Sequence, residues 1–133
     1  MDNVIVWADI PVVDLDRACR FYSAVLQMEV KAVEGMDGIA LPGGDGDGGA
    51  PDQQGPMPVA FDLARGENQR PSTQGCTIYL NSHNDPEGMI ARAVDAGGEL
   101  LMPVTDMGPM VGSIGFFRDS EGNRIGVHKP PQM

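Results

Sequence analysis

The order of predicted elements occurs twice along the chain. A strand over residues 4–12 precedes a helix that begins after Asp14, and a strand over residues 76–81 precedes a helix that begins after Asp85. Further strands follow each helix, so both halves show the order β-α-β-β-β. Repeat units of this length indicate a duplicated unit rather than a solenoid array. The pattern therefore predicts an α+β fold built from two βαβββ modules.

The two modules are expected to lie within one domain over residues 1–133, because a chain of this length normally folds as a single domain. We place them at about residues 1–65 and 75–133. Two such units can curl their sheets to form one concave cleft. A cleft walled by two sheets is a natural place for a small molecule.

Both predicted helices have clear start and stop signals. Asp14 and Asp85 stand where a carboxylate can accept a hydrogen bond from an unpaired amide. After Asp14, apolar residues recur at spacings of three and four over about three turns. After Asp85, a proline takes the first helical position, and Gly97 and Gly98 end the second helix.

The chain closes with a stretch typical of a β-hairpin. Two short runs, Phe116–Arg118 and Arg124–His128, flank a polar turn that contains Gly122 and Asn123. Glycine and asparagine supply the backbone angles that a tight reversal needs. We therefore expect two paired strands at this end of the second module.

Charge and composition exclude some partners. The formal net charge of −10 disfavours nucleic acid and anionic membrane surfaces, which both attract clustered Lys and Arg. No apolar run approaches the length of a membrane span, and the first residues do not resemble a signal peptide, so we expect a cytoplasmic protein. Cys19 and Cys76 are expected to be free thiols. The Gly- and Pro-rich residues 43–58 predict a solvated acidic loop.

Three stretches carry a family resemblance. They are IPVVDLDRACRFYSAVL in the first half, GCTIYLN followed by a helix and DAGGEL in the second, and FRDSEGNRIGVH at the end. In this order they resemble the vicinal oxygen chelate superfamily, which includes glyoxalase I, bleomycin-resistance proteins and extradiol dioxygenases. The resemblance covers essentially the whole chain. It implies paired βαβββ modules whose curled, mixed sheet encloses a central cleft.

The resemblance also implies a metal site. Many members hold one divalent metal between a His on the first strand, a His or Glu later in the first module, a His at the start of the second module, and a Glu on the closing strand. Imidazole and carboxylate ligands suit Zn, Ni, Mn or Fe. The metal would act as a Lewis acid on two neighbouring substrate oxygens.

The residues at these positions are poor ligands. The alignment places Trp7, Thr77 and Gly126 at three of them, and the fourth falls within residues 59–63, where Asp62 is the candidate acid. An indole ring, a threonine hydroxyl and a glycine do not supply the metal-ligand atoms that imidazole and carboxylate groups provide. We therefore expect no cofactor, with a divalent metal at a relocated site as the alternative.

The same four residues are candidates for ligand binding, since they would line the cleft: Trp7, Asp62, Thr77 and Gly126. Trp7 could stack on a planar ligand, or could simply fill the cleft. Tyr79 is expected to face the helix layer instead.

Two further residues are catalytic candidates, Asp9 and His128. Alternation along a strand places Asp9 on the face of Trp7, and His128 on the face of Gly126. A buried Asp has a raised pKa unless it is paired, and it could act as a base. Alternatively, Asp9 is a paired strand acid and His128 a solvent-exposed residue.

These observations leave several functions open. The first is a metal-free protein of the glyoxalase and bleomycin-resistance type that binds a small apolar or aromatic molecule. The second is a metal-free isomerase or lyase with Asp or His as acid and base. The third is a metal-dependent lyase or dioxygenase with a relocated site, and the fourth is an interaction module without chemistry. A homodimer is expected by analogy with small members of the superfamily.

Overall fold

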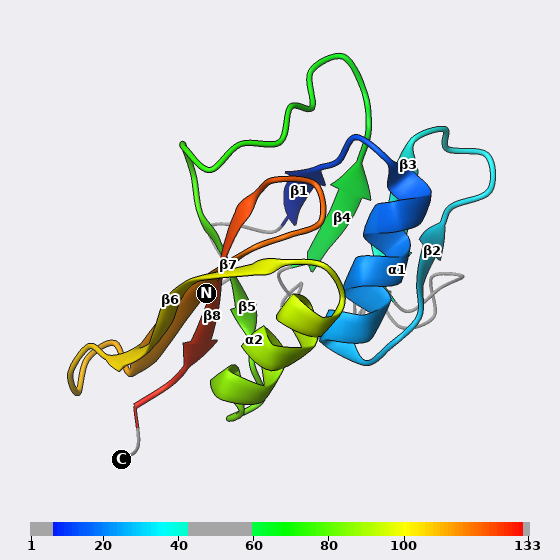
Figure 1. Ribbon diagram of the computed structural model, residues 1–133. Coiled ribbons are helices and arrows are strands. Elements are labelled where there is room, and N and C mark those ends of the chain that lie inside the picture. The colour runs from blue at the N-terminus through cyan, green and yellow to red at the C-terminus, as the bar shows by residue number, and fades with distance from the viewer. Residues whose placement is uncertain (1–6, 43–59, 132–133) are drawn as a thin grey trace, which may run out of the picture.

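The structure is a computed structural model that describes residues 7–42 and 60–131. Its element order agrees with the duplicated pattern (Figure 1). The predicted loop at residues 43–58 lies outside the described residues. The elements are β1 (Trp7–Pro11), α1 (Leu15–Leu26), β2 (Val30–Ala32), β3 (Ile39–Pro42), β4 (Ala60–Ala64), β5 (Ile78–Asn81), α2 (Pro86–Asp95), β6 (Glu99–Asp106), β7 (Ser113–Arg118) and β8 (Arg124–Lys129).

The described strands form two mixed sheets of four strands each. Their orders are β1-β4-β3-β2 and β5-β8-β7-β6. In each sheet the first pair is parallel and the other pairs are antiparallel. The same strand order in both sheets confirms the α+β, glyoxalase-like fold. The expected single curled sheet is present as two separate sheets among the described strands.

The helix boundaries follow from the predicted caps. Asp14 accepts a hydrogen bond from the Arg17 amide at 3.0 Å, and Asp85 accepts one from the Gly88 amide at 3.0 Å. Helix α1 ends at Gln27, whose left-handed φ of 55° stops the helix. Neither helix of the described chain is long and apolar enough to cross a membrane.

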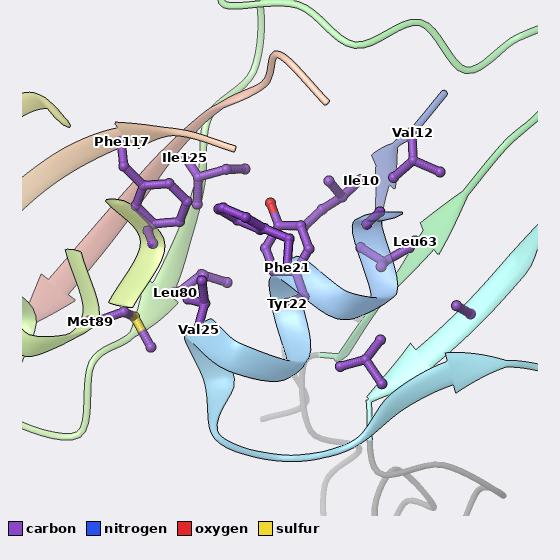
Figure 2. Packing of buried hydrophobic residues seen from close by; sticks show 14 of the residues in the cluster. Ile10, Val12, Phe21, Tyr22, Val25, Leu63, Leu80, Met89, Phe117 and Ile125 are labelled. Carbon is purple, nitrogen blue, oxygen red and sulfur yellow. The ribbon is translucent and has the colours of Figure 1, made fainter. Parts of the chain in front are cut away.

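Both helices cover the same side of the strands and pack against each other (Figure 1). Helix α1 contributes Phe21 and Tyr22 to the core, where the Phe21 ring lies 5.9 Å from the ring of Phe117 on β7. Figure 2 shows these rings among Ile10 and Leu63 from the first sheet and further apolar residues from the second. One helix thus joins the cores of both sheets.

The predicted closing hairpin is present as β7 and β8, paired antiparallel up to Arg118 and Arg124. Its turn is bound to the first half of the chain by buried polar groups. The Tyr22 hydroxyl donates to Asp119 Oδ2 at 2.6 Å, and Asn123 Nδ2 donates to the Pro11 carbonyl at 2.7 Å. The turn therefore holds β8 close to the end of β1.

Glu121 in the same turn accepts hydrogen bonds at the start of α1. Its Oε1 accepts from the amides of Val13 and Asp14 at 2.8 and 2.7 Å, and its Oε2 accepts from Arg17 Nε at 2.7 Å. Burial alone would raise the pKa of Glu121, but these hydrogen bonds lower it to about 2. Glu121 is therefore an ionised link between the hairpin and α1.

Candidate ligand-binding site

The first half of the candidate site lies on β1 and β4. These strands are parallel, with Asp9 opposite Asp62. Ile10 points into the core, so alternation places Trp7 and Asp9 on the other face, away from the helices. Trp7 is 42% exposed and does not fill the core.

Asp62 is a buried acid with a raised pKa. It is only 6% exposed, and its Oδ1 has no hydrogen-bond partner among the described residues. Burial, followed by the neighbouring Asp9 carboxyl group, raises the pKa of Asp62 to about 7, while a hydrogen bond from the Trp7 side chain acts in the opposite direction. Near neutral pH the protonated and ionised forms of Asp62 are therefore present in comparable amounts.

The second half of the site lies on β5, β8 and β7, and it corrects the expectation for Tyr79. Leu80 points into the core, and Tyr79 lies on the opposite face beside Gly126. The expectation was wrong because Thr77 and Tyr79 are two residues apart and so share a face. A Cβ atom at Gly126 would overlap the Tyr79 ring, so that ring covers the position where a metal ligand was expected.

Arg124 is the prominent residue of this half. Its guanidinium carbon lies 3.8 Å from the centre of the Phe116 ring, and its Nη1 donates to Thr77 Oγ1 at 2.9 Å. The centre of the Tyr79 ring lies 5.7 Å from the centre of the same Phe116 ring. Sequence reasoning did not select Arg124, although alternation along β8 places it on the face of Gly126.

A cavity of about 220 Å³ joins the two halves. It lies between the ends of β1 and β8, with Asp9 on one wall and Arg124 on another. Arg70, Ser72 and Gln74, from the segment before β5, and Asn123 add polar groups to its lining. Asp62 is the neighbour of Asp9 on β4, and Thr77 accepts a hydrogen bond from Arg124, but neither residue lines the cavity. The lining thus contains one carboxyl group, that of Asp9, and two guanidinium groups.

Of the six predicted site residues, Asp9 lines this cavity, whereas Trp7, Asp62, Thr77, Gly126 and His128 do not. Gly126 lies under Tyr79, and His128 is four residues past Arg124, about 13 Å further along an extended strand. The His128 Nε2 atom lies 2.6 Å from the Val111 carbonyl, in the loop between β6 and β7. A larger hollow of about 540 Å³, near the start of α1, contains none of the predicted site residues.

The fold and this geometry agree with the comparison to known families. The chain matches the model of the Glyoxalase/Bleomycin resistance protein/Dioxygenase superfamily over residues 4–127, and it belongs to that superfamily. No curated protein matches the chain.

Solved structures show the same fold at low sequence identity. A glyoxalase-related enzyme from Fulvimarina pelagi has a TM-score of 0.65 at 16% identity, over 93% of this chain and 86% of that one. A glyoxalase/bleomycin resistance protein from Albidiferax ferrireducens T118 has a TM-score of 0.65 at 20% identity, over 94% and 98%. TnmS3, an antibiotic binding protein from Streptomyces sp. CB03234, has a TM-score of 0.58 at 17% identity, over 96% of each chain. These similarities concern the fold alone.

The residues at the usual metal positions do not fit a metal ion. Trp7 and Gly126 offer no ligand atom, and the Thr77 hydroxyl already accepts from Arg124. The carboxylates of Asp62 and Asp9 are the remaining oxygen donors. Within residues 7–42 and 60–131, no group of three or more His, Cys, Asp or Glu side chains could hold a metal.

Proposed function

We propose that this chain is a metal-free, small-molecule-binding member of its superfamily, with the ligand in the cavity between β1 and β8. The observation that carries the proposal is the mixed lining of that cavity. Its lining includes the apolar residues Ile10, Ile78 and Ile125 together with acidic Asp9 and basic Arg124. Apolar walls with a few placed polar groups are typical of ligand sites. The antibiotic binding protein TnmS3, which has the same fold, supports a binding role.

The size of the cavity limits the ligand. A volume of about 220 Å³ is below the range of about 300–1,000 Å³ that is usual for drug-sized ligands. We propose a small planar compound, or one ring of a larger compound whose remainder extends over Trp7. Trp7 is half exposed beside the Asp9 and Asp62 pair, so its indole face is available for stacking.

Trp7 provides the test because it is the chain's single tryptophan. A library of aromatic and heteroaromatic fragments is screened for quenching or shift of its emission. Hits are repeated with Cys76→Arg, which places a large side chain at an exposed position of the cavity lining and should abolish binding. Val94→Arg, at an exposed position on α2, is the matched control. If no compound changes the emission, or if Cys76→Arg binds as well as the wild type, the proposal fails.

A second function is favoured by one specific observation, the raised pKa of Asp62. A carboxyl group with a pKa of about 7 is suited to take and return a proton near neutral pH. The alternative proposal is a metal-free isomerase or lyase. Asp9, which lines the cavity, would receive the proton of a carbon acid, and Asp62 beside it would hold that proton until it returns to another atom of the substrate. Arg124 would stabilise the negative charge that develops.

The two functions predict different pH behaviour. For an enzyme, kcat/KM should rise with pH through about 7, and Asp62→Asn should abolish turnover. His128→Gln should leave turnover unchanged, because His128 is bonded to Val111 outside the cavity. Turnover that survives Asp62→Asn would contradict the acid-base proposal.

Three further properties belong to the proposal. The absence of a resident metal is tested by elemental analysis of untagged protein, where stoichiometric Zn, Ni, Mn or Fe would overturn it. A homodimer is tested by sedimentation equilibrium. Exposed Leu100 and Leu101 on the sheet edge formed by β6 are consistent with an association surface. A cytoplasmic location is tested by cell fractionation.

A further inference from the structure

Arg124 is a fixed cation that has no anionic partner among the described residues. The Phe116 ring and the Thr77 hydroxyl hold its guanidinium group in one orientation. The ion pairs among the described residues do not include it. The chain has 19 acidic residues and only nine basic ones, so an unpaired arginine is not explained by a shortage of carboxylates.

Three other arginines have acidic partners: Arg17 pairs with Glu121, Arg65 with Asp37, and Arg118 with Glu99. Arg20, Arg70 and Arg92 have no ion pair among the described residues, and half-buried Arg92 donates instead to the Val25 carbonyl. Arg124 is half-buried and yet is held by an aromatic ring and a neutral hydroxyl. A partly buried charge is costly unless an opposite charge compensates it. The missing compensation therefore points to a ligand.

The cavity places this cation where a ligand can reach it. Arg124 and Arg70 both line the space of about 220 Å³, and Arg70 also lacks an ion pair among the described residues. Asp9 lies on the β1 wall of the same cavity. The lining therefore carries two basic side chains and one acidic side chain.

We propose that the cavity binds a small planar carboxylate, with its carboxylate group on Arg124. The planar, fork-shaped guanidinium group matches a carboxylate in two parallel hydrogen bonds, and its orientation is set before the ligand arrives. Arg70 adds a second positive charge, and Asp9 on the β1 wall can accept from a hydrogen-bond donor elsewhere on the ligand. This inference depends on the proposed binding function and specifies its ligand class.

The test uses matched ligands on the full chain. Benzoate, 4-hydroxybenzoate, cinnamate and furan-2-carboxylate are each compared with the corresponding primary amide, which has the same shape and no charge. Binding is followed by NMR, through the indole N–H signal of Trp7 and the side-chain N–H signal of Arg124. We expect the carboxylates to bind about tenfold more tightly than their amides, as expected for a charge-assisted hydrogen bond, and added salt should weaken them alone.

Variants separate the anchor from general effects of charge. Arg124→Gln should reduce carboxylate affinity about tenfold and remove the preference for carboxylates over amides. Arg124→Lys should keep only part of the carboxylate affinity of the wild type. Arg70→Gln, at an exposed position, should give a smaller loss and keeps the test valid if Arg124 variants fold poorly. Arg118→Gln, an exposed arginine outside the cavity, is the control.

The outcomes distinguish the two proposals. If amides bind as tightly as carboxylates, or if neither cavity variant lowers carboxylate affinity, the carboxylate inference is wrong while ligand binding in the cavity stands. If no compound of either set moves the cavity signals, and the neutral fragment library also fails to change Trp7 emission, both proposals are wrong.

Discussion

Asp9 and Asp62 lie side by side on parallel strands, and Asp62 binds a proton more strongly in the folded chain than in the unfolded chain. The folded pKa of Asp62 is about 7, whereas the ordinary value is 3.8. Between these values the folded chain binds more protons than the unfolded chain. The contribution of Asp62 to the stability is therefore fully present below about pH 4 and is lost as the pH rises through 7.

The first prediction concerns this pH dependence. Asp62→Asn removes the titrating group, so the stability of the variant relative to the wild type should be about 2–3 kcal/mol higher at pH 8 than at pH 5. Urea unfolding at the two pH values measures the difference. Asp37→Asn, at a fully exposed acid, is the control and should leave the wild-type slope unchanged. An unaltered slope in Asp62→Asn would contradict the assignment.

The second prediction concerns Gly126 and the ring above it. A methyl group at this position overlaps the Tyr79 ring, which must swing away from Phe116. Gly126→Ala should cost about 1 kcal/mol in the wild-type background and much less in Tyr79→Ala. A double-mutant cycle from urea unfolding measures this coupling. Additive effects would show that the ring is not displaced.

The sequence predicted part of the candidate site at the level of single residues. Alternation along one strand correctly placed Trp7 and Asp9 on the same face, because that rule is local. Tyr79 was misplaced because the alternation was applied with the wrong parity. Arg124 was missed because its role depends on Phe116 on β7 and on Thr77, just before β5. Contacts between strands are not visible in spacing along one strand.

At the scale of elements, helix caps and the closing hairpin were predictable from local signals. Asp14 and Asp85 cap the helices as expected, and the turn after β7 forms where glycine and asparagine stand. The sequence did not reveal that Glu121 in this turn binds the start of α1, since these segments are more than 100 residues apart. Such contacts depend on how the two halves pack.

The third prediction follows from the Glu121 contacts. Glu121→Gln loses the ion pair with Arg17 and leaves hydrogen-bond donors poorly matched, so it should cost about 3 kcal/mol at pH 7. Glu99→Gln breaks the exposed pair with Arg118 and should cost less than about 1 kcal/mol. Urea unfolding compares the two variants.

The pH dependence gives an independent check of the same contacts. The pKa of Glu121 is lowered from 4.5 to about 2 in the folded chain. Its contribution to stability is therefore present above about pH 4.5 and is lost as the pH falls through 2. Glu121→Gln should flatten the acid limb of the stability curve. Equal costs for Glu121→Gln and Glu99→Gln would contradict the role of the hairpin in holding α1.

At the scale of the whole molecule, the duplicated element order predicted the fold, because each half repeats the same local signals. It did not predict that α1 would join two separate sheets. That packing depends on the shapes of Phe21, Tyr22 and Phe117, which only the folded arrangement brings together. The candidate cavity likewise exists only because the hairpin turn holds β8 near the end of β1.

The last prediction is that both halves unfold together. The core is continuous through α1, and the Tyr22 hydroxyl links it to Asp119 in the second half. Urea unfolding followed by Trp7 emission, which reports on β1, should therefore coincide with unfolding followed by far-UV circular dichroism. Tyr22→Phe removes one buried hydrogen bond to a charged group and should shift both curves equally, by about 1–2 kcal/mol. Separate transitions, or a shift in one curve alone, would show that residues 1–133 form two independently unfolding units instead of the single domain that the sequence predicts.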